Sequence, residues 1–287
     1  MTAGPDDISA TLAVLARSDV ARALAEDLGS GDLTAGLVDP AKRARARILA
    51  REAAVICGAP WAEAAFHSQD PGARIHWLVP EGTRCAADQV VVEIESTAAA
   101  LLSAERTALN FLQLLSAVAT KTAVYVEAVR GTRAQIVDTR KTLPGLRLAQ
   151  KYAVRTGGGT NHRIGLYDAV LIKENHIAAA GGVTAVLRAA DRVAGQAKFI
   201  EIEVETLAQL EEALAAGARM VLLDNMALPM LREAVRINAG RAILEISGGV
   251  TLDSVRALAE TGVDRISIGA LTKDVKATDF SMRLQEL

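Results

Sequence analysis

The chain has 287 residues, 51% of them hydrophobic and 3% aromatic, with a formal net charge of −2 and a pI near 6.1. This length suits about two domains, and without positive charge or many aromatic rings we expect no nucleic-acid partner. No apolar run approaches the roughly 18 residues that span a bilayer, and the first ten residues lack the apolar core of a secretory signal. We therefore expect a soluble, cytoplasmic protein without a membrane partner, in which Cys57 and Cys85 are small buried side chains rather than a disulfide.

The first part of the chain predicts an α+β domain. The first 25 residues are predicted to form a helix. Residues 41–96 hold short strand-like segments separated by proline and glycine, without regular long helices between them, which indicates an antiparallel sheet. Residues 101–131 follow as one or two long helices with an apolar stripe, and we expect this stretch to bridge two domains.

The second half alternates apolar segments with helical ones. The segments rich in Val, Ile and Leu are 135–138, 169–172, 199–204, 220–224, 242–246 and 265–269. The helical, Ala-rich stretches are 184–194, 207–218 and 252–263, and Gly217 and Gly262 stand where glycines end helices. This alternation predicts parallel β/α units, in a barrel or in an open doubly wound sheet. We favour the barrel, because polar groups follow five of the strands and a barrel brings all the C-terminal strand ends to one face.

Four cations stand at strand or loop ends. Arg140 and Lys141 follow the segment 135–138, Arg163 follows a glycine-rich stretch, and Lys173 closes the segment 169–172. An adjacent Arg–Lys pair can be an ordinary surface feature. Cations at strand ends are costly to bury without partners, however, and we expect these four to have no matching acids beside them. Because Arg captures carboxylate or phosphate bidentately and Lys supplies a point charge, the pattern predicts a pocket for an anion with two or more charges.

Carboxylates and glycines follow the neighbouring strands. Glu201 and Glu203 point to the same side of one strand, since side chains alternate with period two; a solvated strand face is the alternative interpretation for Glu201. Glu203 and Asp224 lie nearer their strand ends, and carboxylates beside a phosphate pocket commonly hold Mg²⁺ or sugar hydroxyls. The segments SGG (247–249) and IGALT (268–272) suit a phosphate site built from the last two β/α loops.

Several longer motifs resemble the quinolinate phosphoribosyltransferase family, from about Glu26 to the C-terminus. The motifs are EDLGSGDLT (26–34), ERTALNF (105–111), DTRKTLPGLR (138–147), GGGTNHR (157–163), LIKENH (171–176), EIEVET (201–206), LLDN (222–225), SGG (247–249) and IGALT (268–272). The resemblance implies an α/β fold: an N-terminal α/β sandwich domain (1–116), to which residues 275–287 return, and an incomplete parallel β/α barrel (117–274). It implies a homodimer, with a hexamer left open, in which the sandwich of one subunit caps the barrel of the other.

The resemblance also implies a reaction: quinolinate and 5-phosphoribosyl 1-pyrophosphate give nicotinate mononucleotide, CO₂ and pyrophosphate, with Mg²⁺ as cofactor, in de novo NAD synthesis. By the same resemblance, Lys141, Glu203 and Asp224 are catalytic, and the two carboxylates are the metal or ribose ligands. The implied substrate-binding residues are Arg106 (from the partner subunit), Thr139, Arg140, His162, Arg163, Lys173, Ser247, Gly248, Gly249, Ile268, Gly269 and Ala270.

Four alternatives remain open. A nicotinate phosphoribosyltransferase would have a substrate with one carboxylate, which gives less reason for so many cations. Molybdenum-associated paralogues tend to lose the ERTALNF and KENH segments, which this sequence retains. A Schiff-base aldolase would use Lys173 as its nucleophile, and a non-catalytic phosphate-binding barrel would leave the dicarboxylate pocket unexplained.

Overall fold

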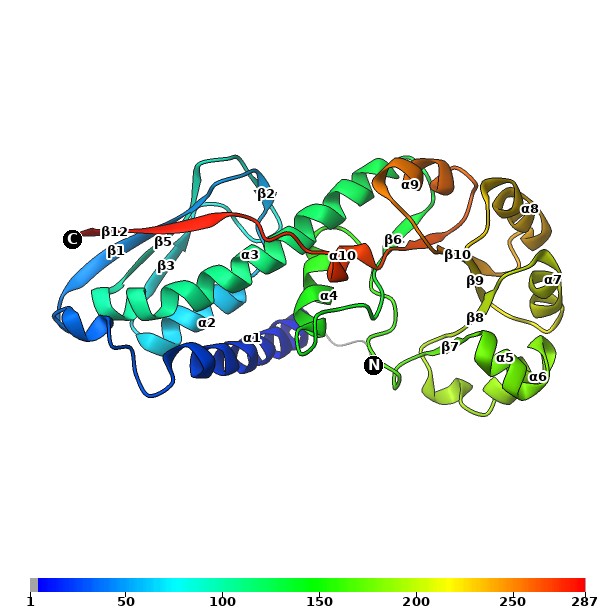
Figure 1. Ribbon diagram of the computed structural model, residues 1–287, viewed down its shortest axis with the longest axis horizontal. Helices are drawn as coiled ribbons and strands as arrows, with labels where there is room; N and C mark the ends of the chain where they lie inside the picture. The colour runs from blue at the N-terminus through cyan, green and yellow to red at the C-terminus, as the bar shows by residue number, and fades with distance from the viewer. Residues whose placement is uncertain (1–4, 287) are drawn as a thin grey trace. The chain divides into compact units, whose positions relative to one another are not determined.

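The computed structural model describes residues 5–286, with the side chains of residues 11–285 (Figure 1). The chain forms two compact units. The first comprises residues 1–121, 144–157 and 274–287, and the second comprises residues 122–143 and 158–273. The division along the chain lies a few residues from the predicted boundaries. It also assigns residues 144–157 to the first unit, which the sequence did not indicate.

The first unit contains a four-stranded antiparallel sheet in the order β12-β1-β5-β3. Its strands are β1 (Arg43–Ala50), β3 (Arg74–Trp77), β5 (Gln89–Thr97) and β12 (Phe280–Glu286). Side-chain burial alternates along β1, whose sequence is RARARILA: its alanines and Ile48 are buried, while its arginines and Leu49 lie on the other face. Arg45 and Arg47 pair with Glu95 and Glu93 of β5, which fixes the register of this strand pair. The predicted antiparallel sheet is confirmed.

Helices complete the first unit. They are α1 (Pro5–Leu28), α2 (Ala59–Gln69), the first part of α3 (Ala98–Ala128) and α4 (Arg147–Thr156), and the two-residue strands β2 (Ala54–Val55) and β4 (Arg84–Cys85) pair beside them. The N-terminal helix predicted for the first 25 residues is confirmed from Pro5 onward as α1, and residues 1–4 lie outside the described residues. In α1, Asp19 accepts a 3.0 Å hydrogen bond from the indole of Trp61 in α2. The α2 helix was not predicted. Cys57 and Cys85 are free and buried, as predicted.

Glu81 ties α4 to the first unit. Its carboxylate accepts hydrogen bonds from the main-chain N–H groups of Gly58 and Ala59 at the start of α2, at 2.9 and 3.0 Å. The Tyr152 hydroxyl of α4 donates to the same carboxylate at 2.9 Å. These contacts explain why residues 144–157 belong with the first unit.

The long helix α3 passes from the first unit into the second at residue 121. By length and composition alone it could cross a membrane, but 56% of its most apolar window is buried inside the protein. Leu109, Leu112, Leu115 and Val118, the predicted apolar stripe, are all at most 1% exposed. The helix therefore has the character of a core helix.

The second unit is built on a six-stranded parallel sheet in the order β6-β11-β10-β9-β8-β7. The strands are β6 (Gln135–Val137), β7 (Val170–Ile172), β8 (Ile200–Val204), β9 (Met220–Asp224), β10 (Ile243–Ser247) and β11 (Arg265–Ser267). Figure 1 shows α6 (Val183–Ala190), α7 (Leu207–Ala215), α8 (Leu228–Asn238) and α9 (Leu252–Ala259) along the outer side of this curved sheet. The short helices α5 (Glu174–Ala180) and α10 (Ala270–Lys273) follow β7 and β11.

Strands β6 and β7 form the two edges of the sheet and do not pair with each other, so the sheet does not close. It is the incomplete barrel that was predicted. Because all six strands are parallel, their C-terminal ends and the loops that follow them share one edge of the sheet. This edge carries the polar groups singled out in the sequence.

Candidate active site

A cavity of about 250 Å³, open to solvent, lies at the C-terminal edge of the parallel sheet. It is lined by Thr139, Arg140, Lys141, His162, Arg163, Leu171, Lys173, Glu203, Leu222, Glu245, Ser247 and Ser267. Eight of the predicted site residues are among them, drawn from five separate stretches of chain. The predicted convergence of strand-end groups on one site therefore holds for these eight residues.

Several cationic side chains line this cavity. Arg140 and Lys141 leave the end of β6, and Arg163 reaches the cavity from the loop after α4. Arg163 is only 8% exposed. Burial, and next the nearby Arg140 guanidinium, lower the pKa of Arg163. The two cations thus repel each other, and a bound anion would relieve that repulsion.

Lys173 has an acidic partner. Its Nζ lies 2.8 Å from Oε2 of Glu203 on the neighbouring strand β8. The expectation that the strand-end cations lack matching acids is therefore wrong for Lys173, because the sheet places Glu203 opposite it although the two are 30 residues apart.

Buried polar contacts hold the loop that carries Arg163. Asp138, fully buried at the end of β6, accepts hydrogen bonds from the main-chain N–H of His162 at 2.9 Å and from the Asn161 amide at 2.6 Å. Asp168 accepts from the N–H groups of Ile164 and Gly165, both at 2.9 Å. These hydrogen bonds to main-chain N–H groups hold the backbone on both sides of Arg163 in place.

Two carboxylates stand at the ends of β8 and β9. Burial raises the pKa of Asp224, and the negative charge of Glu203 raises it further, so the two groups are close enough to repel. The Asn225 side chain donates to Asp224 Oδ2 at 2.7 Å and orients it. Hard carboxylate oxygens of this kind fit Mg²⁺, which binds proteins through one or two carboxylates and completes its shell with water and phosphate oxygens.

Glycines at two strand ends allow close approach of neighbouring groups. Gly248 follows β10 with φ of 99°, and a side chain there would overlap with the Asn225 side chain. Gly269 follows β11, and a Cβ atom there would lie 2.9 Å from the Lys141 side chain. The Thr272 hydroxyl donates to the Lys141 carbonyl at 2.7 Å, which fixes the Lys141 main chain beside this loop.

The remaining predicted residues do not line the cavity. Asp224, Gly248, Gly249, Ile268, Gly269 and Ala270 are sequence neighbours of Ser247 and Ser267 or lie at the adjacent strand end. Arg106 lies on α3 within the first unit, where it is exposed. Four lining residues were missed: Leu171, Leu222, Glu245 and Ser267. The sequence signal for Glu245 was a single charge inside the apolar segment AILEI.

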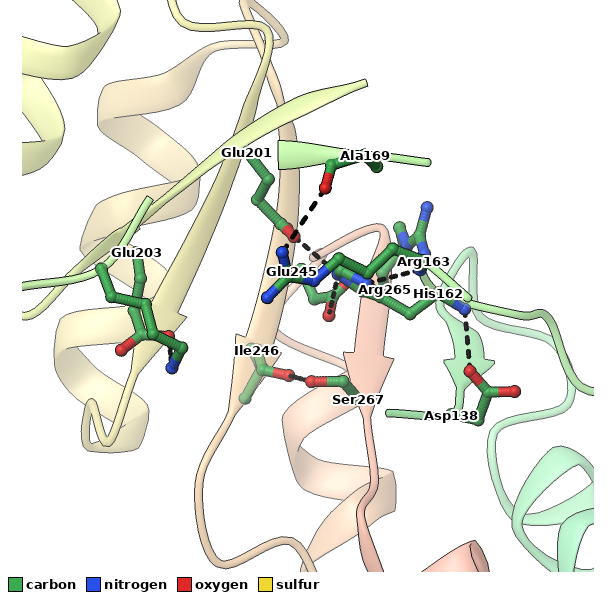
Figure 2. A network of polar contacts seen from close by, with 11 residues as sticks. Asp138, His162, Arg163, Ala169, Glu201, Glu203, Glu245, Ile246, Arg265 and Ser267 are labelled. Carbon is green, nitrogen blue, oxygen red and sulfur yellow. Dashed lines mark hydrogen bonds and ion pairs between the residues drawn. The ribbon is translucent and has the colours of Figure 1, made fainter. Parts of the chain in front are cut away.

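A buried polar network lies beside the cavity (Figure 2). Glu201 and Glu245 are both 0% exposed, so the alternative that Glu201 lies on a solvated face is wrong. His162 Nε2 lies 2.7 Å from Glu201 Oε2 and 3.6 Å from Glu245 Oε1, and Arg265 Nε forms an ion pair with Glu245 Oε2 at 2.9 Å. Burial raises the pKa of Glu201 to about 8 and that of Glu245 to about 7.

Comparison with known families decides the identity of this arrangement. The model of the quinolinate phosphoribosyl transferase C-terminal domain matches residues 118–283, and that of the N-terminal domain matches residues 32–116. The chain belongs to the quinolinate phosphoribosyltransferase family. The resemblance drawn from the motifs is thereby confirmed, and the chain is a phosphoribosyltransferase.

Relatives of this phosphoribosyltransferase match nearly its whole length. The chain is 43% identical over 276 residues to the nicotinate-nucleotide pyrophosphorylase [carboxylating] of Mycobacterium leprae, covering 94% of this chain and 97% of the relative. It is 42% identical over 257 residues to a probable enzyme of the same name from Bacillus subtilis, covering 90% and 89%. The structure of the Francisella tularensis nicotinate-nucleotide pyrophosphorylase superposes with a TM-score of 0.92 at 42% identity, covering 95% and 97%. The predicted two-domain α/β fold is confirmed.

Proposed function

We propose that this enzyme joins quinolinate to 5-phosphoribosyl 1-pyrophosphate and releases nicotinate mononucleotide, CO₂ and pyrophosphate, a step of NAD biosynthesis. The observation that carries this proposal is the convergence of Arg140, Arg163 and Lys173 on one cavity. A pyridine dicarboxylate supplies the two negative charges that such a set requires. The names of the related enzymes support the same reaction.

Arg140 and Arg163 are the proposed ligands of the quinolinate carboxylates, because a guanidinium binds a carboxylate through two parallel hydrogen bonds. Lys173 would add a point charge. Its Nζ is engaged by Glu203 at 2.8 Å, and the family to which the chain belongs consists of phosphoribosyltransferases, not of aldolases that act through a Schiff base. The aldolase alternative is therefore disfavoured. Thr139 and His162 line the same cavity, and their contact with substrate stays a prediction.

Lys141 and the loops after β10 and β11 form the proposed donor site. Gly248 and Gly249 have φ of 99° and 58°, and without side chains they let phosphate oxygens approach the main-chain N–H groups. Ile268, Gly269 and Ala270 would contribute in the same way. Ser247 lines the cavity between these loops and the cations.

Glu203 and Asp224 are the proposed holders of Mg²⁺ or of the ribose hydroxyls. Bound there with the donor, Mg²⁺ would neutralise charge on the departing pyrophosphate. Lys141 would stabilise the same leaving group as its charge develops. The pyridine nitrogen attacks the ribose carbon as pyrophosphate leaves, and the ring becomes cationic. This electron sink lets the adjacent carboxylate leave as CO₂, and the ring carbon that keeps the electron pair then takes up a proton from water. The chain then acts by positioning and charge compensation, without a protein nucleophile.

We also propose that the enzyme is a homodimer in which Arg106 enters the active site of the partner subunit. Arg106 is exposed on α3 and is therefore available for such a contact. A hexamer and a cytoplasmic location stay predictions.

The test is a turnover assay with purified protein, Mg²⁺, phosphoribosyl pyrophosphate and either quinolinate or nicotinate, following nucleotide and CO₂ together. We expect equal amounts of nucleotide and CO₂ with quinolinate and no nucleotide with nicotinate. Efficient use of nicotinate would refute the dicarboxylate assignment. Failure with both substrates in a well-folded protein would refute the reaction.

A further inference from the structure

The proposed reaction makes no use of Glu201, Glu245 or Arg265, although they form a buried network next to the cavity (Figure 2). Burying charged groups is costly unless they are paired. Here Arg265 pairs with Glu245, and the His162 ring faces Glu201. Because burying these charged groups is energetically costly and the network adjoins the cations of the cavity, we expect the network to serve the site.

The hydrogen bonds of His162 fix its tautomer. Its Nδ1 accepts a 2.7 Å hydrogen bond from the main-chain N–H of Arg163, so Nδ1 carries the lone pair. The ring hydrogen therefore sits on Nε2, which donates to Glu201 Oε2 at 2.7 Å. With both nitrogens engaged, the ring is a rigid link between the Glu201 carboxylate and the main chain of Arg163.

This link bears on the guanidinium of Arg163. Asp138 holds the main chain of His162 from one side, and Glu201 holds its ring from the other. Among the residues that the structure describes, the Arg163 guanidinium donates one hydrogen bond, a long one of 3.4 Å to the Ala169 carbonyl. Asp168 and Glu201 attract it electrostatically, but no short side-chain hydrogen bond fixes its direction. Its direction consequently depends on how firmly its main chain is held.

We propose that Glu201 is a positioning residue for carboxylate recognition. Through His162 it fixes the main chain of Arg163 and so directs the guanidinium into the cavity, while Arg265 and Glu245 complete the buried network. The inference rests on the proposed function, because it assumes that Arg163 binds a substrate carboxylate.

A metal ion is the competing occupant of this network. Ligand atoms of His162, Glu201 and Glu245 lie within 4.8 Å of one another. However, Nε2 of His162 already carries a hydrogen directed at Glu201, and Arg265 already stands as a cation at Glu245. These two groups compete with a metal ion for the ligand atoms, whereas Glu201 Oε1 and Glu245 Oε1 have no hydrogen-bond partner among the described residues.

The test compares Glu201→Leu with Glu201→Gln by calorimetric titration of quinolinate and, separately, of phosphoribosyl pyrophosphate. Leucine removes the acceptor of the His162 hydrogen, whereas glutamine keeps a neutral acceptor of the same shape. We expect Glu201→Leu to raise the dissociation constant of quinolinate about 10- to 100-fold, the range for leaving one buried donor unpaired. Glu201→Gln should stay within about threefold of wild type, and donor binding should not change in either variant.

The matched control is Leu210→Ala, which loosens the core of the same unit at a fully buried position on α7 away from the cavity. It should leave quinolinate affinity unchanged. An equal loss in this control would show general loosening and overturn the positioning role. If Glu201→Leu does not fold, Glu201→Asp tests the same point, since it keeps the carboxyl group but draws the oxygens back from His162.

Other outcomes separate the inference from the function. A wild-type protein that does not bind quinolinate would refute the proposed function and the inference with it. Wild-type binding that persists unchanged in Glu201→Leu, or a loss as large in Glu201→Gln, would refute only the positioning role. One tightly held metal ion per chain in dialysed protein, lost on Glu245→Gln, would assign the network to a metal instead.

Discussion

Replacing Gly248 by alanine is expected to damage both the fold and the donor site. Gly248 follows β10 with φ of 99°, a conformation that residues with a side chain rarely adopt. A Cβ atom there would also overlap with the Asn225 side chain and approach the Asn225 main-chain nitrogen to 3.2 Å. Because Asn225 donates to Asp224 at 2.7 Å, its displacement would release Asp224.

The magnitude follows from these contacts. A non-glycine residue in a sparsely populated backbone region costs on the order of 1–3 kcal/mol, and displacing the exposed Asn225 hydrogen bond adds roughly 1 kcal/mol. Alanine restricts the unfolded chain and returns roughly 0.4–1 kcal/mol. We therefore expect Gly248→Ala to lower the free energy of unfolding by about 2–3 kcal/mol and to weaken donor binding about tenfold.

The assay is urea denaturation together with calorimetric titration of phosphoribosyl pyrophosphate. Gly249→Ala is the matched comparison for stability alone, because its φ of 58° lies in the left-handed region and a Cβ atom there would contact nothing within 4 Å; it is no control for donor binding, since Gly249 itself belongs to the proposed donor site. Gly131→Ala, with φ of 81° and the same open space, controls for backbone strain away from the site. If Gly248→Ala were as stable as these two variants and bound the donor normally, the argument from the Asn225 contact would be refuted.

Four further outcomes are expected. Arg140→Ala should lower kcat/KM for quinolinate by a factor equivalent to about 2–4 kcal/mol of transition-state stabilisation. Arg236→Ala, which removes an exposed arginine on α8, should leave kcat/KM unchanged. An unchanged kcat/KM in Arg140→Ala would exclude Arg140 from the substrate site. Because burial raises the pKa of Glu245 from 4.5 to about 7, wild type should lose unfolding free energy as the pH rises from about 4.5 through 7. Glu245→Gln should flatten that loss in urea titrations at pH 5 and 8, and an equal loss in both proteins would contradict the assignment. Chelation of Mg²⁺ should abolish turnover, and adding Mg²⁺ again should restore it. Full activity in the presence of the chelator would show that Glu203 and Asp224 do not hold Mg²⁺ and would leave them as ligands of the ribose hydroxyls. Thr206→Ala should cost about 1 kcal/mol of stability by removing the cap of α7 without affecting turnover; a change in kcat would show that the cap acts on the site.

The strands of the second unit could be predicted from the sequence to within one or two residues. Parallel strands are covered on both faces, so they appear as continuous apolar runs that propensity and length identify. Helix α5 was missed because none of its residues is buried, so no apolar period marks it. Helix α8 was also missed, although its buried residues Leu231, Ala234 and Asn238 recur at helical spacing.

The candidate site was predictable as a set of strand ends but not as a set of contacts. Parallel topology alone brings the groups after β6, β7 and β8 to one edge, which is why Arg140, Lys141, Lys173 and Glu203 could be placed together. Their partners could not be predicted, since the Lys173–Glu203 pair joins residues 30 apart in the chain.

The sequence by itself determined the order of the elements, the family and the edge of the sheet where the chemistry gathers. Only the tertiary structure decided the fate of Glu201 and Glu203, which alternation places on the same side of one strand. Glu203 reaches the cavity and pairs with Lys173, whereas Glu201 is fully buried against His162. The reason is that burial and charge balance depend on the depth within the barrel and on neighbouring strands, and local sequence carries neither.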